Sequence, residues 1–146
     1  MAEAKVLSGA GLRGQVAGQT ALSTVGQAGA GLTYRGYDVR DLAANALFEE
    51  VAYLLLYGEL PNKAQLAEYQ ARLKTLRDLP QALKEVLERI PANAHPMDVM
   101  RTGCSVLGTL EQELNFDQQR DRTDRLLALF PAVMCYWYRF SHHGVR

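Results

Sequence analysis

The chain has 146 residues, a mass of 16.2 kDa, 16 basic and 16 acidic side chains, and a formal net charge of +0. Balanced charge and an isoelectric point near 6.8 argue against a nucleic-acid-binding domain, which usually has a basic face and a pI above about 9. No run approaches the roughly 20 apolar residues of a spanning helix and the first residues lack a signal-peptide core, so we expect a cytoplasmic protein with no membrane partner.

Glycine interrupts the first third of the chain, where charge is sparse. Residues 20–25 and 32–35 are short runs with β-branched and aromatic side chains, and they flank a glycine-rich turn at 26–31. This pattern predicts a small β-hairpin within an N-terminal arm, 1–37, with an irregular arm as the alternative. Gly9, Gly11 and the turn glycines lack the strand and helix that surround a phosphate-binding loop.

Helical spacing begins after Asp38. Asp38 or Asp41 can cap a short helical turn over 39–46. Residues 48–57 are apolar on nearly every face, and Gly58 is placed to end this helix. A helix apolar on most faces is expected to be buried.

Three more helices are expected before residue 110. Asn62 can cap the first, which continues to Leu79 and Pro80. Its apolar stripe consists of Leu66, Tyr69, Leu73 and Leu76. Residues 82–90 form a second amphipathic helix, and Pro96 occupies the first turn of a third, where a missing N–H costs nothing.

The third of these helices contains many small side chains, which let another helix approach closely. They are Gly103, Cys104, Ser105, Gly108 and Thr109. A polar loop at 111–120 then leads to a long helix over 121–140, which tolerates Pro131 as a kink. The predicted fold is therefore all-α, with helices over 38–110 and 121–140 and one small hairpin near the N-terminus.

Side chains suited to catalysis or metal binding are few. His95 precedes a helix and is expected to cap or pack there, whereas His142 and His143 follow Ser141 in a terminal loop. Adjacent residues rarely face one another, so this triplet is no catalytic triad, and the histidine pair lacks a third metal ligand. No catalytic residue and no metal ligand is predicted.

The remaining polar candidates also favour structural roles. Cys104 and Cys135 are too far apart for a metal-binding pair and are expected to be reduced, buried thiols. The adjacent carboxylates Glu49 and Glu50 flank an apolar stripe. Arg72 borders the stripe of Leu66, Tyr69, Leu73 and Leu76. It is the one candidate for binding an anionic substrate, with a simple solvated charge as the alternative.

Three segments, 32–43, 48–61 and 95–102, resemble in order and spacing the N-terminal portion of the citrate synthase family. Residues 16–26 and 136–144 are similar to its bacterial 2-methylcitrate synthase branch. Ordinary citrate synthase is the nearest alternative within the family. The resemblance identifies 1–146 as the N-terminal part of the family's large helical domain, without the small catalytic domain.

The resemblance implies a homodimer or higher homo-oligomer, associated through apolar helices, that condenses an acyl-CoA thioester with oxaloacetate. In the methylcitrate branch the thioester is propionyl-CoA, and the reaction serves propionate catabolism. An Asp removes the α-proton, one His stabilises the enol, and a second His polarises the oxaloacetate carbonyl. Domain closure excludes water.

No residue of this chain matches those catalytic positions, so the chain by itself is expected to be inactive and to bind no cofactor. Arg72 is the single residue offered as facing substrate. The abrupt end after an apolar helix favours an N-terminal fragment. The alternative from another class is a complete, non-catalytic helical module that self-associates.

Overall fold

The computed structural model describes residues 18–26 and 31–146. Gly9 and Gly11, considered above as phosphate-loop candidates, lie outside these residues. The contacts divide the chain into two units, Met1–Ala46 and Leu47–Arg146. The chain is mostly helical with one small antiparallel sheet, which confirms the predicted fold class.

The first unit contains the predicted hairpin and one strand more. Its elements are β1 (Ser23–Val25), β2 (Leu32–Tyr34), β3 (Tyr37–Asp38) and the short helix α1 (Val39–Asn45). The strands pair antiparallel in the order β1-β2-β3, with Thr24 opposite Thr33 and their hydroxyl oxygens 2.5 Å apart. Asp38 caps α1, as expected, by accepting a hydrogen bond from the Arg40 backbone N–H.

The third strand escaped prediction because it is two residues long and joined to β2 by a tight turn. Arg35 and Gly36 form this turn with φ of 49° and 91°. Glycine adopts a positive φ freely, whereas arginine adopts it at some cost.

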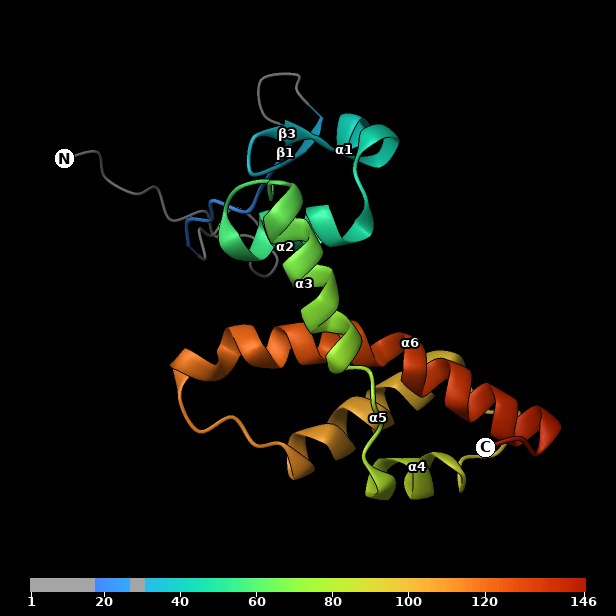
Figure 1. Ribbon diagram of the computed structural model, residues 1–146. Helices are drawn as coiled ribbons and strands as arrows, with labels where there is room; N and C mark the ends of the chain where they lie inside the picture. Colours follow the sequence, from blue (N-terminus) through green and yellow to red (C-terminus); the bar gives the residue numbers. More distant parts are fainter. Residues whose placement is uncertain (1–17, 27–30) are drawn as a thin grey trace, which may run out of the picture. The chain divides into compact units, whose positions relative to one another are not determined.

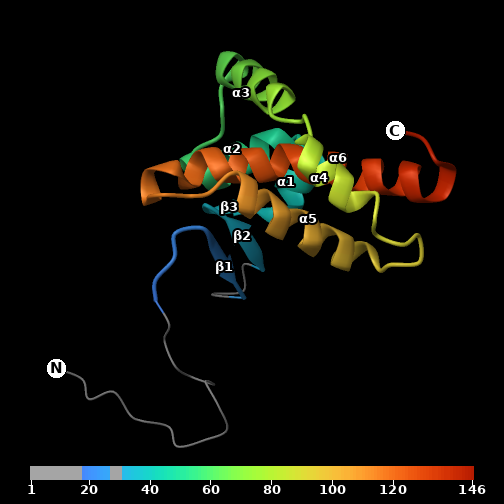
Figure 2. The ribbon, with the colours of Figure 1, turned by 90° about the horizontal axis from the view of Figure 1, so that it is seen from below.

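The second unit is entirely helical in its regular elements (Figures 1 and 2). They are α2 (Phe48–Tyr57), α3 (Lys63–Thr75), α4 (Gln81–Leu87), α5 (Pro96–Leu110), the 3₁₀ turn η2 (Phe116–Gln118) and α6 (Gln119–His143). Each predicted helix is present. Three ends were wrong: α3 stops at Thr75, before Leu79, α4 stops at Leu87, before Ile90, and α6 extends to His143.

The helix ends follow the expected capping chemistry. Asn62 accepts hydrogen bonds from the backbone N–H groups of Ala64 and Gln65, and the Gln65 side chain accepts one from the Asn62 N–H. This reciprocal pair is a capping box. Gly58 ends α2 in the left-handed region at φ 97°, a conformation that favours glycine.

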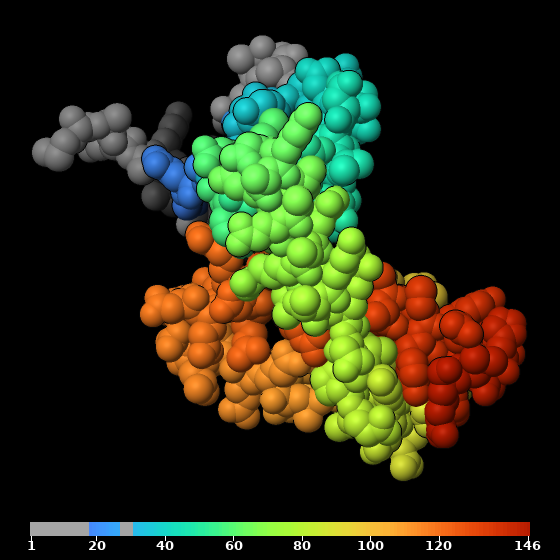
Figure 3. All heavy atoms as spheres, viewed as in Figure 1, coloured from blue at the N-terminus to red at the C-terminus, as the bar shows by residue number. Residues whose placement is uncertain are grey.

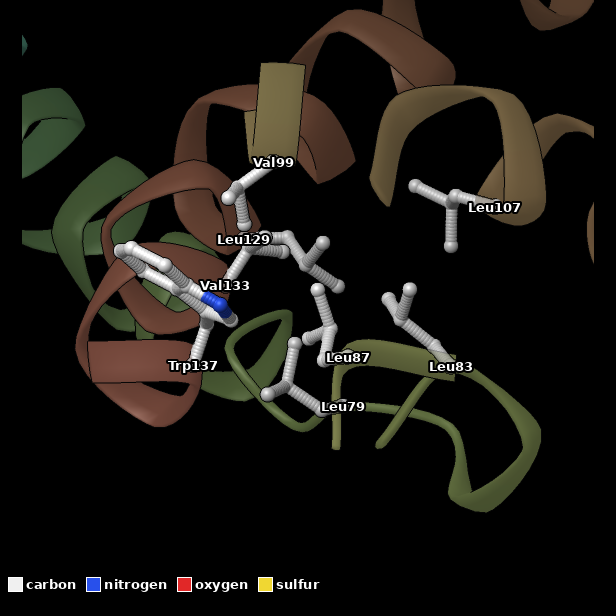
Figure 4. Close-up of a cluster of buried hydrophobic side chains, with 8 residues drawn as sticks. All are labelled: Leu79, Leu83, Leu87, Val99, Leu107, Leu129, Val133 and Trp137. Atoms are coloured by element: carbon white, nitrogen blue, oxygen red, sulfur yellow. The ribbon is translucent and has the colours of Figure 1, made fainter. Parts of the chain in front are cut away.

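A large apolar cluster joins α4, α5 and α6 (Figure 4). Its buried members are Leu79, Leu83, Leu87, Val99, Leu107, Leu129, Val133 and Trp137. In Figure 4 the Trp137 ring lies at the side of the leucines and valines contributed by the three helices and by Leu79, which precedes α4. Gly103 brings α5 close to α6, since a Cβ there would lie 2.9 Å from Val133 Cγ1.

A smaller cluster joins α2, α3 and α6. It contains Ala52, Tyr69, Leu73 and Ala128, with Tyr53, Tyr57, Leu76 and Leu127 partly buried around it. The expectation that α2 is buried on most faces was wrong. Ala52 and Leu54 are buried, but Phe48, in the first turn, is 64% exposed.

Candidate functional site

The predicted substrate residue, Arg72, lies in the last turns of α3 and faces α6. Its Nη2 is 2.6 Å from Asp121 Oδ1, and its Nε donates to Asp124 Oδ2 at 3.0 Å. Burial works against the guanidinium charge, but the hydrogen bond that Arg72 donates to Asp121 and the nearby Asp124 charge raise the pKa of Arg72 above its ordinary value. The side chain is therefore a fixed cation paired with two carboxylates.

Asp124 is the centre of this arrangement. It is 0% exposed, the single buried charged residue in the described part of the chain. Besides the Arg72 bond, it accepts hydrogen bonds from the Tyr69 hydroxyl at 2.9 Å and from the Tyr57 hydroxyl at 3.3 Å. A buried carboxylate needs such donors, since an unpaired one costs several kcal/mol (about 3–5).

Three tyrosine rings pack together beside Asp124. Tyr53 and Tyr57 stack with centroids 4.3 Å apart, and Tyr69 meets both rings edge-on. Burial and the hydrogen bond to Asp124 raise the pKa of Tyr69 well above its ordinary value, and burial together with the Asp124 charge raises the pKa of Tyr57. Both hydroxyls thus remain protonated donors at neutral pH.

An open hollow of about 450 Å³ lies over this group. Its lining residues are Tyr53, Tyr57, Gln65, Glu68, Tyr69, Arg72 and Thr75. The carboxylates of Asp121, Asp124 and Glu68 outnumber the guanidinium of Arg72 and that of Arg120, which sits 4.8 Å from the Tyr57 ring centroid. The hollow offers hydrogen-bonding groups and aromatic faces but no nucleophile paired with a base. The predicted contact between Arg72 and substrate stays a prediction.

A second arginine, Arg125, connects the C-terminal ends of α3 and α5 to α6. Its Nη1 donates to the carbonyls of Leu76 and Asp78, while Nε and Nη2 donate to the Glu111 carboxylate. The carbonyl of Leu76 follows the end of α3, where carbonyls lack helical partners. The role of Arg125 is structural.

The histidines take part in local packing and capping. His95 Nδ1 accepts a hydrogen bond from the Met97 N–H and so caps α5, as expected. His142 and His143 were expected in a loop but belong to α6, because the helix continues to Gly144. The His142 ring stacks on Tyr138 at 4.2 Å, and its Nδ1 lies 2.9 Å from Ser141 Oγ and 3.2 Å from the Tyr138 carbonyl.

Cys104 and Cys135 are both free, and both are exposed. The prediction of burial was wrong, because neither cysteine stands at one of the buried positions of its helix, which are Val99, Gly103 and Leu107 in α5 and Asp124, Ala128, Leu129, Val133 and Trp137 in α6. Among residues 18–26 and 31–146, no group of three or more His, Cys, Asp or Glu side chains is placed to hold a metal ion. None of the helices described there has the length and apolar character needed to cross a bilayer.

Asp124 was not among the residues predicted from the sequence. The available signal was its spacing: Asp124 lies one turn before Leu127 and Ala128, two apolar residues that continue the same stripe of α6. An acidic residue at a position where the stripe calls for an apolar one is expected to be buried with partners.

Comparison with protein families gives a match over residues 11–146 to the family model described as "Citrate synthase, C-terminal domain". A 2-methylcitrate synthase of Shewanella oneidensis is 73% identical over all 146 residues, which are 39% of that protein. A citrate synthase of Mycolicibacterium smegmatis is 42% identical over 127 residues, covering 85% of this chain and 34% of the relative.

Solved structures give the same result for the fold. A citrate synthase of Thermoplasma acidophilum, in a ternary complex with carboxymethyl coenzyme A and oxaloacetate, matches with a TM-score of 0.80 and 25% identity. The match covers 89% of this chain and 35% of that one. The chain thus spans well under half the length of the relatives that it matches.

Proposed function

The chain belongs to the citrate synthase family, and from that premise we propose that it is the N-terminal part of a 2-methylcitrate synthase. The longer protein would condense propionyl-CoA with oxaloacetate to give 2-methylcitrate and CoA. The observation that carries this proposal is the 73% identity to a 2-methylcitrate synthase across every residue of the chain. Identity to the citrate synthase of Mycolicibacterium smegmatis is 42%, which makes citrate synthase the weaker alternative.

The residues of this chain favour a structural role in the longer protein over a catalytic one. In the described part of the chain, the titratable groups with a shifted pKa are held by partners within the fold, such as Tyr69 by Asp124 and Glu88 by Arg146. No described histidine is placed as a general base beside a nucleophile that a third group orients. The chain alone is therefore proposed to be inactive and to bind no cofactor.

The experiment is a condensation assay with the protein encoded by the whole open reading frame. Release of free CoA with oxaloacetate is expected to be faster from propionyl-CoA than from acetyl-CoA. A preference for acetyl-CoA would identify a citrate synthase instead. The 146-residue chain is the matched control, and clear turnover by it would contradict the proposal that it lacks the catalytic groups.

Substrate binding by Arg72 is proposed on its position at the edge of the 450 Å³ hollow, with a side chain 44% exposed. In the longer protein, Arg72→Lys would keep the charge and lose the forked hydrogen bonds. A raised KM with an unchanged unfolding midpoint would support a substrate contact. A lowered midpoint with an unchanged KM would assign Arg72 to the fold alone.

Self-association is proposed for the exposed apolar side chains of the helical unit. Exposed large apolar residues include Met97, Leu110, Leu114, Phe116 and Tyr138. Sedimentation of the chain is expected to show a homodimer or a higher homo-oligomer, and a stable monomer would contradict this. The predicted cytoplasmic location is tested by cell fractionation.

A complete, non-catalytic self-associating module is the alternative from another class. The intact mass of the protein, read together with the position of the stop codon in its gene, decides between the two.

A further inference from the structure

The buried carboxylate of Asp124 has a role in the fold that is independent of the proposed function. Asp124 stands on the inner stripe of α6, one turn before the buried Ala128. Each of its oxygens is used: Tyr69 donates to Oδ1, and Arg72 and Tyr57 donate to Oδ2. All three donors come from α2 and α3.

These contacts define which residue of α6 faces the α2–α3 pair. A shift of α6 by one residue moves a side chain about 100° around the helix axis and 1.5 Å along it. Such a shift would replace Asp124 with Thr123 or Arg125, neither of which can accept hydrogen bonds from a guanidinium and two hydroxyls as a carboxylate does. Arg72 Nη2 also donates a hydrogen bond to Asp121, one turn earlier on α6, and this contact requires the same alignment of the helices.

The apolar contacts around Asp124 specify this alignment poorly. Two of the four buried residues in the small cluster are alanines, Ala52 and Ala128. The other side of α6 is different, since the large cluster contains eight buried residues, including Trp137, and a close contact between Gly103 and Val133. Close packing of apolar side chains fixes the position of α6 against α4 and α5. Such packing does not by itself specify how α6 aligns with α2 and α3.

We propose that Asp124 is an alignment residue: it selects one docking of the α2–α3 pair on α6 and lowers stability in doing so. Burying an ion pair in place of well-packed apolar residues of similar volume is often neutral or destabilising. A single buried polar position can nevertheless fix the register between helices. The hydrogen-bond network around Asp124 combines this cost in stability with the selection of one register.

The test replaces the whole network with apolar side chains of similar size, in the 146-residue chain. The variant is D124L with Y57F, Y69F and R72M. Its urea unfolding midpoint, followed by circular dichroism, is expected to equal or exceed that of the wild type. In a ¹H–¹⁵N correlation spectrum, the single sharp peaks of α2 and α3 residues are expected to split or broaden, while those of α5 residues stay single and sharp.

The matched control removes the exposed pair of Asp98 and Arg101, whose Oδ1 and Nη2 are 3.0 Å apart, by D98L with R101M. That variant should keep single peaks in all helices. A network variant with an unchanged or raised midpoint and single sharp peaks in α2 and α3 would overturn the alignment role. A lowered midpoint, including failure to fold, would overturn it as well, because the network would then be a net source of stability.

A second variant, D124N, keeps the size of the side chain and all three donors. It loses the charge and turns one acceptor into a donor. A loss of single peaks confined to α2 and α3 is expected. An equal loss in α5 would contradict a role specific to the docking of α2 and α3.

Discussion

The hydroxyl of Tyr69 stabilises the helical unit through a single hydrogen bond. It donates to the buried Asp124 at 2.9 Å from a side chain that is 3% exposed. Tyr69→Phe removes this donor and leaves a buried acceptor with fewer partners, at a cost of about 1–3 kcal/mol. Urea unfolding measures the loss. Tyr53→Phe is the matched control, because Tyr53 belongs to the same ring group and its hydroxyl has no hydrogen-bond partner among the described residues.

The same hydroxyl predicts sensitivity to alkaline pH. The pKa of Tyr69 is raised in the folded chain, first by burial and then by its hydrogen bond to Asp124. Above about pH 10 the unfolded tyrosine loses its proton while the folded one keeps it, so the free energy of unfolding falls as pH rises further. Tyr69→Phe should make that fall less steep. An equal slope in the variant would mean that other groups cause the alkaline loss.

The carboxylate of Glu88 is expected to make the free energy of unfolding depend on pH in the acid range, where stability is lost as pH falls. Hydrogen bonds from Arg146 and Tyr136 lower the pKa of Glu88 to about 2. The stabilisation is complete above the ordinary value near 4.5 and is lost as pH falls from there towards 2. Glu88→Gln should therefore lower the unfolding midpoint at pH 7 and flatten its decline in that window. Glu85→Gln serves as the control, since Glu85 is bound by the neutral Gln81 side chain.

At the scale of elements, α5 contains two glycines in contrasting surroundings. A Cβ on Gly103 would lie 2.9 Å from Cγ1 of Val133, a β-branched side chain 1% exposed, whereas a Cβ on Gly108 would meet nothing within 4 Å. Alanine favours a helix by up to about 1 kcal/mol over glycine, but overpacking costs about 1–3 kcal/mol. Gly108→Ala should raise the thermal unfolding midpoint and Gly103→Ala should lower it. A gain from both would mean that Val133 moves aside freely.

Helix positions could be predicted from the sequence because their signals are local. Asn62, Gly58 and His95 stand at the helix ends where capping rules place them. The end of α6 was underestimated by three residues because Ser141 and the histidines are polar, yet the left-handed Gly144 and its bond to the Phe140 carbonyl set the true end.

Burial could be predicted less well, because it depends on which elements meet. The sequence favoured buried cysteines, yet Cys104 and Cys135 are exposed. It placed Arg72 beside an apolar stripe but gave no sign of its two carboxylate partners, which lie 49 and 52 residues later in the chain. Pairings across such distances come from tertiary packing, which local periodicity does not encode.

For the whole molecule, both apolar clusters lie in the second unit. Their buried members fall between Ala52 and Trp137, whereas the first unit ends at Ala46. A chain that starts at Leu47 is therefore expected to keep its helical circular dichroism and the fluorescence maximum of Trp137. A red-shifted maximum, as for a solvent-exposed indole, would contradict this. Trp137→Phe in the same shortened chain identifies the signal.

The end of α6 turns back towards α4. The Gly144 N–H bonds to the Phe140 carbonyl, the Val145 N–H bonds to the Arg139 carbonyl, and the Arg146 guanidinium reaches both oxygens of Glu88 at 2.8 and 2.9 Å. In the space-filling view, the red C-terminal atoms lie against the yellow-green atoms that precede α5 (Figure 3). This turn links the C-terminal end of α6 to the C-terminal end of α4.

The position of α6 in the chain also affects synthesis. Both clusters draw on α6, through Ala128 in one and through Leu129, Val133 and Trp137 in the other. At roughly 5–20 residues per second, α2 to α5 leave the ribosome several seconds before α6 is complete. During that time their leucines lack the part of their burial that α6 provides, and they are open to chaperones or to aggregation. Among these helices, α6 is thus the one that completes both clusters.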